Sequence, residues 1–310
     1  MIFAAMKKTS TSALAGYAAI LFSMLLWGLS FVWTKHLLNS NFPVFTIVTV
    51  RLSIASLVFV SFFKWRGLLE KIRREDLKDF VLLSFFEPFL YFIGENFGLK
   101  YVDASFAAVI IALIPILVSV TMFFVESVPI RWEFILGAAI SLVGVGLLSV
   151  NPDGAIGISV KGVLLLCVAL VAAVGYSVLL NRLVNKYRPL TVTTYQNLIA
   201  IPFYLPFMLA FDMKVWPSLA WDATNIFCLV CLAILCSAGA YMLYSYSVKQ
   251  LTVTKVSVFT NLIPIVTLLV AAAIGQETFS NLKLLGIVVV VAGVMFSQTK
   301  IRKRSEIKDC

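Results

Sequence analysis

Residues 109–116 read VIIALIPI, and residues 258–265 read VFTNLIPI. The two stretches align at an offset of 149 residues, and the same offset aligns Lys100 with Lys249, Gly137 with Gly286, Gly144 with Gly293 and Val145 with Val294. No gap is needed. Apolar residues often match by chance, so the Gly, Pro and Lys positions are the informative ones. They indicate an internal duplication.

The earlier part of each half repeats at a slightly smaller offset. Gly16, Gly28, Ser30, Lys35 and Pro43 correspond to Gly162, Gly175, Ser177, Arg182 and Pro189. We therefore place the first half at 13–150 and the second at 151–299. A short N-terminal segment, 1–12, precedes them, and a basic tail, 300–310, follows.

The composition places almost the whole chain in lipid. Of the 310 residues, 61% are hydrophobic and 13% are charged, and the mean hydropathy is +0.99, whereas soluble domains carry about 25% charged residues. A helix needs about 20 apolar residues to cross a hydrocarbon core of about 30 Å. We predict an all-α membrane protein with ten spans, approximately 13–34, 42–63, 79–99, 103–125, 132–150, 161–180, 190–211, 223–247, 252–274 and 282–299.

The basic residues indicate how these spans are oriented. With loops assigned alternately to two sides, 19 Lys and Arg residues fall on the side of both termini, five fall on the other side, and Arg51 lies within a span. Cytoplasmic loops carry the excess of basic residues, so we expect both termini in the cytoplasm and the chain in the plasma (inner) membrane. Five is an odd number of spans, so the second half enters from the opposite side. The halves are then inverted repeats.

Several classes of function are disfavoured by the same composition. The net charge of +10 does not indicate a nucleic-acid partner, because the basic residues lie in short loops where anionic lipid headgroups attract them. Cys228 and Cys231 have a CxxC spacing, but the chain has one His and no second cysteine pair, so we expect no metal and no cofactor. Neither GxSxG nor HExxH occurs, so we expect no catalytic residues and no enzyme.

The order of motifs in the first half resembles the drug/metabolite transporter superfamily, of the EamA type. WGLSF at 27–31 is followed by Lys35, and Arg51 is followed by small residues. GLKYVDAS at 98–105 then leads to a helix with Pro115, to Glu126 and to glycines at 137 and 144.

The second half repeats the later elements of this order and departs from the earlier ones. The repeated positions are Lys249, Pro264, Glu277, Gly286 and Gly293. Val174 and Gly175 stand where the first half has Trp27 and Gly28, and Asn197 stands where it has Arg51. The resemblance implies ten helices around a central cavity and the transport of small metabolites such as amino acids. It does not fix the substrate.

Three charged residues lie within predicted spans, namely Arg51, Glu87 and Glu95. Charged groups in the membrane cost several kcal/mol by most estimates, about 2.5–3.5 kcal/mol on insertion scales, and they tend to pair or to line a pathway. Glu87, Tyr91 and Glu95 follow at steps of four, which on a continuous helix places them on one face. We therefore expect a polar stripe on an otherwise Phe-rich helix.

This stripe has two interpretations. In the first, it faces the cavity, and a carboxylate holds a substrate ammonium group or exchanges a coupling proton. In the second, Arg51 neutralises one glutamate in a structural ion pair. We expect one pair and one free carboxylate. If Arg51 pairs with Glu95, then Glu87 is the candidate for protonation, because burial without a partner favours the neutral form.

The remaining candidates are neutral. Trp27 lies in mid-span, where it either forms a wall of the cavity or packs against glycine, and Ser30 follows it. The second half offers Tyr176, Asn197, Tyr241, Tyr244 and Asn261. Pro115 and Pro264 interrupt helical hydrogen bonding, and such broken helices line binding sites in transporters. A plain packing kink is the alternative.

Together these features predict a transporter of small metabolites, amino acids or related solutes, that works by alternating access. We favour export over uptake. A lipid-carrier flippase, a channel and a membrane sensor are the alternatives, and an intramembrane enzyme is the least favoured. The expected partners are a small-molecule substrate, membrane lipids and a coupling proton. Whether the chain acts as a monomer or a homodimer is left open.

Overall fold

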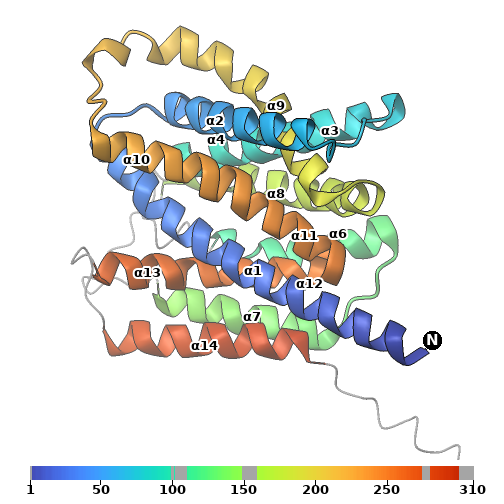
Figure 1. The fold of residues 1–310 in the computed structure, drawn as a ribbon. Coiled ribbons are helices and arrows are strands. Elements are labelled where there is room, and N and C mark those ends of the chain that lie inside the picture. The colour runs from blue at the N-terminus through green and yellow to red at the C-terminus, as the bar shows by residue number, and fades with distance from the viewer. Residues whose placement is uncertain (1, 99–100, 102–109, 149–158, 274–279, 300–310) are drawn as a thin grey trace, which may run out of the picture.

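The computed structural model describes residues 2–98, 101, 110–148, 159–273 and 280–299, and this part of the chain is helical without a strand (Figure 1). The α-helices in order are α1 (Ile2–Asn39), α2 (Val44–Trp65), α3 (Leu77–Ser84), α4 (Tyr91–Gly98), α6 (Ile114–Glu126), α7 (Trp132–Leu148), α8 (Val160–Lys186), α9 (Pro189–Phe207), α10 (Ala223–Cys231), α11 (Tyr241–Leu251), α12 (Val253–Ser257), α13 (Ile263–Ala273) and α14 (Asn281–Gln298).

Six described helical segments are long and apolar enough to cross a membrane. They are Ser12–Asn39, Val44–Trp65, Val160–Lys186, Ala223–Leu251, Val253–Val270 and Asn281–Gln298. α6 and α7 are shorter apolar helices. The predicted all-α membrane fold is confirmed. Each of the four other predicted spans contains a described helix, but their crossing of the membrane stays a prediction. The start of the fourth span, Glu277 and the tail 300–310 lie outside the described residues.

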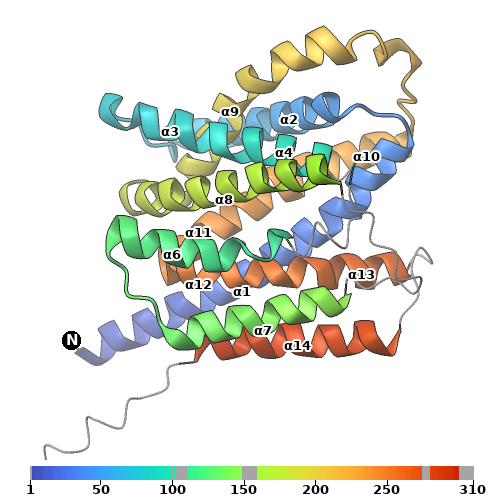
Figure 2. The ribbon, with the colours of Figure 1, turned by 180° about the vertical axis from the view of Figure 1, so that it is seen from behind.

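The helices of the two halves pair with one another. α2 packs on α9, and α7 packs on α14. α1 packs on α11, and α4 packs on α8; because the first span corresponds to the sixth and the third to the eighth, these two pairs are related by exchange of the halves. Figures 1 and 2 show α7 with α14 at one edge of the bundle and α2 with α9 at the other. This is the arrangement that a two-fold relation between the halves produces.

At the seam between α7 and α14, glycines bring the two helix backbones into close contact. A Cβ atom at Gly137 would lie 2.5 Å from the Ser297 nitrogen, and one at Gly293 would lie 2.5 Å from the Ser141 nitrogen. About two turns further along α7, a Cβ at Gly144 would lie 2.6 Å from the Val290 nitrogen. Small residues allow such close backbone contact between membrane helices. The two glycines of each half therefore meet those of the other half across this seam, Gly137 against Gly293 and Gly144 against Gly286.

Gly137→Leu is expected to destabilise the protein, because the seam has no room for even a Cβ atom. Overpacking of a tight contact costs about 1–3 kcal/mol, so we expect a lower unfolding temperature in detergent, measured by size-exclusion chromatography after heating. Gly146→Leu on the same helix is the control, because a Cβ at Gly146 meets no atom within 4 Å. Equal unfolding temperatures for the two variants would contradict the seam.

Candidate functional site

The third span is broken at Glu87. α3 ends at Ser84, α4 begins at Tyr91, and a π-helical stretch, Phe85–Leu90, joins them. Within it, Glu87 has extended backbone angles, φ −146° and ψ 125°. Pro88 explains the break, because a proline disfavours the α conformation in the residue before it and removes a backbone donor.

The predicted stripe on one continuous helix face is therefore wrong in part. Tyr91 and Glu95 do share a face of α4, and the Tyr91 hydroxyl donates a hydrogen bond of 3.0 Å to Glu95 Oε1. Glu87 is separated from them by the break and has a different partner. The Tyr241 hydroxyl of α11 donates to Glu87 Oε1 at 2.8 Å. Both carboxylates are buried.

The backbone carbonyls at the break are bonded by side chains of α9. The Tyr204 hydroxyl donates to the carbonyls of Pro88 and Phe89 at 2.8 and 3.0 Å, and Gln196 Nε2 donates to the carbonyl of Glu87 at 3.0 Å. A carbonyl left unbonded in lipid would cost several kcal/mol. α9 belongs to the second half, so one half satisfies the break in the other.

An aromatic cluster surrounds the Glu87–Tyr241 pair. The ring of Trp27, from α1, lies 5.0 Å from that of Tyr241 and 5.1 Å from that of Tyr244. Tyr176, from α8, lies 6.4 Å from Tyr244 and 6.5 Å from Tyr241. Five sequence-predicted residues from α1, α8, α11 and the third span thus meet. We call Trp27, Glu87, Tyr176, Tyr241 and Tyr244 the Glu87 cluster.

Arg51 is buried in α2, and no carboxylate among the described residues forms an ion pair with it. Its Nε donates to Ser237 Oγ at 2.7 Å, and its guanidinium carbon lies 5.2 Å from the centroid of the Phe92 ring. Among the described residues, no ion pair joins Arg51 to Glu87 or Glu95. The expected structural ion pair is therefore not formed in this structure. Asn197, the counterpart of Arg51 in the repeat, donates to the carbonyl of Ser237 at 2.7 Å.

Two other predicted residues bond away from the Glu87 cluster. The Ser30 hydroxyl donates to the carbonyl of Trp27 in its own helix at 2.7 Å. Asn261 Nδ2 donates to Ser141 Oγ of α7 at 2.7 Å. Their hydrogen bonds hold local structure and helix packing.

The two aligned prolines stand at helix starts. Pro115 is the second residue of α6, and Pro264 is the second residue of α13. A 3₁₀ stretch, Val258–Leu262, precedes α13. α6 and α13 thus each begin one residue before the proline. The cavity expected beside them stays a prediction, because residues 102–109 of the fourth span lie outside the described part.

Sequence reasoning did not select Tyr204 and Ser237 as site residues. Both are neutral residues in apolar spans, and their roles depend on which helices pair. A partial signal existed for the break, because the sequence Phe86-Glu87-Pro88 places a proline inside a predicted span.

Tyr204→Phe is expected to destabilise the third span, because it removes the hydroxyl that donates to the carbonyls of Pro88 and Phe89. A hydrogen bond contributes about 0.5–1.5 kcal/mol, so the unfolding temperature in detergent should fall by a few degrees. Tyr246→Phe is the matched control, because Tyr246 is half-buried on α11 and its hydroxyl makes no hydrogen bond in the described part of the structure. A fall of the same size in both variants would contradict the role of Tyr204.

Comparison with known proteins gives one family. The model of the EamA-like transporter family matches residues 14–150 and again residues 160–299. An uncharacterized transporter of Archaeoglobus fulgidus is 29% identical over 273 residues, which cover 86% of this chain and 94% of the relative. The uncharacterized transporter YcxC of Bacillus subtilis is 27% identical over 314 residues, covering 93% and 94%.

A solved crystal structure has the same fold. It superposes with a TM-score of 0.75 and covers 93% of this chain and 96% of the solved chain, at 20% sequence identity. At this identity the likeness concerns the fold alone.

Proposed function

The chain belongs to the EamA-like transporter family, and from this premise we propose that it exports a small metabolite with an ammonium group, such as an amino acid, by alternating access. It is a multi-pass membrane protein of a transporter family. We place it in the plasma membrane with both termini in the cytoplasm, on the strength of the 19-to-five distribution of Lys and Arg.

The observation that carries the proposal is the Glu87 cluster. A buried carboxylate bonded to Tyr241, with the rings of Trp27, Tyr176 and Tyr244 around it, has the chemistry that an ammonium group requires. The carboxylate supplies charge-assisted hydrogen bonding, and aromatic faces attract cations. A solute bound there would contact both halves, because Glu87 belongs to the first and the three tyrosines to the second.

Export follows if a proton and the ammonium group compete for the Glu87 carboxylate. Protonation on the outer side neutralises Glu87 and releases the solute, and loss of the proton inside restores the charge that binds the next one. Glu95, bonded to Tyr91 on the next helix, offers a second carboxylate through which the proton can pass. A solute shifts the equilibrium between the inward-open and the outward-open state only if it binds the two states with different affinity. The difference in the charge of Glu87 between the two sides supplies this difference in affinity.

Glu87→Gln is expected to abolish the coupling, because an amide neither exchanges a proton nor carries the charge that binds ammonium. We predict that counterflow of a mixture of labelled L-amino acids in proteoliposomes falls by about tenfold or more, the loss expected for a hydrogen bond to a charged group. Stimulation by low pH on the outer side should vanish.

Glu75→Gln is the control, because Glu75 is an exposed carboxylate whose ion pair with Arg73 is also exposed. It should transport like the wild type. Stimulation by low outer pH that survives Glu87→Gln would contradict the coupling role. Flux of the amino acids through the wild type without saturation would identify a channel instead.

A further inference from the structure

A second binding position lies beside the Glu87 cluster. Arg51 is 6% exposed, and its one hydrogen bond to a described residue runs from Nε to Ser237. Its two terminal nitrogens therefore have no hydrogen-bond or ion-pair partner in the described part of the chain. The Phe92 ring covers the guanidinium at 5.2 Å. A charged group with this much of its hydrogen-bonding capacity unused is unusual within a membrane span.

The same short segment holds both charges. Ser237, which binds Arg51, and Tyr241, which binds Glu87, are four residues apart in the eighth span, or about 6 Å of helix rise. Two neighbouring residues of the facing helix α9 bond the backbone at these positions. Asn197 donates to the carbonyl of Ser237, and Gln196 donates to the carbonyl of Glu87. Arg51 and Glu87 are thus bonded to residues about one turn apart in the same span, and no ion pair joins them among the described residues.

We propose that Arg51 binds the carboxylate of the transported solute, so that the site selects zwitterions and places the ammonium group at Glu87. This rests on the proposed function and adds the substrate class. A guanidinium group can bind a carboxylate through two parallel N–H donors. The two terminal nitrogens of Arg51 can do so, because they bond no other described residue. Binding of one zwitterion would pair both buried charges at once.

The test compares solutes with and without a carboxylate. Wild-type proteoliposomes are assayed for counterflow of labelled L-amino acids and, separately, of the corresponding decarboxylated amines. Arg51→Gln should reduce amino-acid counterflow by about tenfold or more and should leave amine counterflow unchanged. Arg51→Lys should give an intermediate loss, because a lysine keeps the charge without the fork.

The outcomes separate the two proposals. Equal amino-acid counterflow in Arg51→Gln and wild type would overturn the carboxylate site while leaving the Glu87 function in place. Transport of neither solute class by the wild type would overturn the proposed function itself. Ser237→Ala, which keeps Arg51 but removes the acceptor of its Nε, should raise the KM for amino acids more than it lowers the maximal rate. An unchanged KM in that variant would count against Ser237 as a positioning residue.

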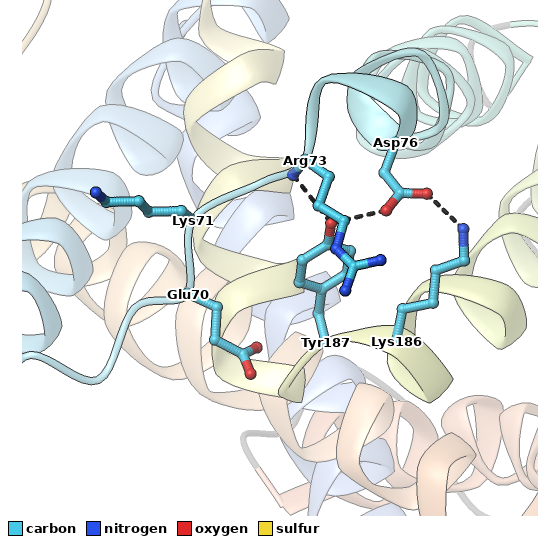
Figure 3. A pocket seen from close by; sticks show the side chains of 6 residues that line it. All are labelled: Glu70, Lys71, Arg73, Asp76, Lys186 and Tyr187. Carbon is cyan, nitrogen blue, oxygen red and sulfur yellow. Dashed lines mark hydrogen bonds and ion pairs between the residues drawn. The ribbon is translucent and has the colours of Figure 1, made fainter.

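A separate set of contacts joins the two halves at the membrane face where α1 begins, which we call the N-terminal face. There the Asp76 carboxylate, ahead of α3, binds Lys186 and accepts a 2.7 Å hydrogen bond from the Tyr187 hydroxyl (Figure 3). Hydrogen bonds from Lys186 and Tyr187 lower the pKa of the Asp76 carboxyl, so it remains charged at neutral pH. A pocket of about 330 Å³ lies among these residues.

The loop between α2 and α3, which leads to Asp76, also contacts the start of α9. Glu70 Oε2 accepts a hydrogen bond of 2.6 Å from the backbone nitrogen of Arg188, and the Glu70 nitrogen donates to Thr191 Oγ1 at 3.3 Å. The loop between α2 and α3 of the first half is thereby bonded to the corner between α8 and α9 of the second.

We call this set of contacts between the halves a joint. The opposite membrane face has a similar joint, in which the carboxylate comes from the second half and the helix start from the first. Asp212, the last residue of the π-helical stretch Met208–Asp212 that continues α9, accepts hydrogen bonds from the nitrogen and Oγ1 of Thr46 at 2.7 and 2.9 Å. Thr46 lies at the start of α2, which corresponds in the repeat to the start of α9. Trp216 Nε1 adds a bond of 3.0 Å to Thr46 Oγ1. At each face, a carboxylate of one half accepts a hydrogen bond from a backbone nitrogen at the start of a helix of the other half.

We infer that these two joints are the gates of the transporter, both closed in this structure and opened one at a time. Cysteine pairs at Glu70 with Thr191 and at Thr46 with Asp212, each in a cysteine-free background that transports, test the inference. Oxidative cross-linking of either pair should reduce counterflow to about a tenth or less, and a reductant should restore it.

A cysteine pair at Asp222 and Asn225 is the control, because these hydrogen-bonded residues belong to one half. Its cross-link should leave counterflow unchanged. Full counterflow in protein cross-linked at either gate would show that this joint does not open, and would overturn the inference.

Discussion

Every polar backbone group within a membrane needs a partner in the protein, because lipid offers none. The break at Glu87 exposes several such groups in the middle of the third span. Tyr204 and Gln196 of α9 bond them, and both side chains come from the other half of the chain. The position of the Glu87 carboxylate therefore depends on the pairing of the halves. Neither half alone could hold this site in lipid.

The two copies of the repeat have become complementary rather than equivalent. The first provides the buried charges Arg51, Glu87 and Glu95, and the second provides hydroxyl groups that bond two of them, Ser237 to Arg51 and Tyr241 to Glu87. Glu95 is the exception, since its partner Tyr91 lies on its own helix. Asn197 occupies the place of Arg51 in the second copy and bonds to the residue that Arg51 binds. Duplication thus supplied the architecture, and divergence distributed charges and their partners between the copies.

Features that depend on local sequence could be predicted, and those that depend on helix pairing could not. Hydropathy and the offset of 149 predicted the helical bundle and its two halves. The stripe failed because four-residue spacing assumes an uninterrupted helix, which Pro88 prevents. The role of Tyr204 could not be predicted, because the sequence of an apolar span does not indicate which carbonyl of another helix a neutral side chain will bond.

The break also divides one span into two helices of eight residues each, α3 and α4. Each helix end carries roughly half a unit of charge, positive at the start and negative at the end. An unbroken span holds these fractional charges at the membrane surfaces, where water screens them. Here the negative end of α3 and the positive end of α4 meet inside the bundle, with Glu87 between them. The backbone itself thus sets an electric field at the depth of Glu87.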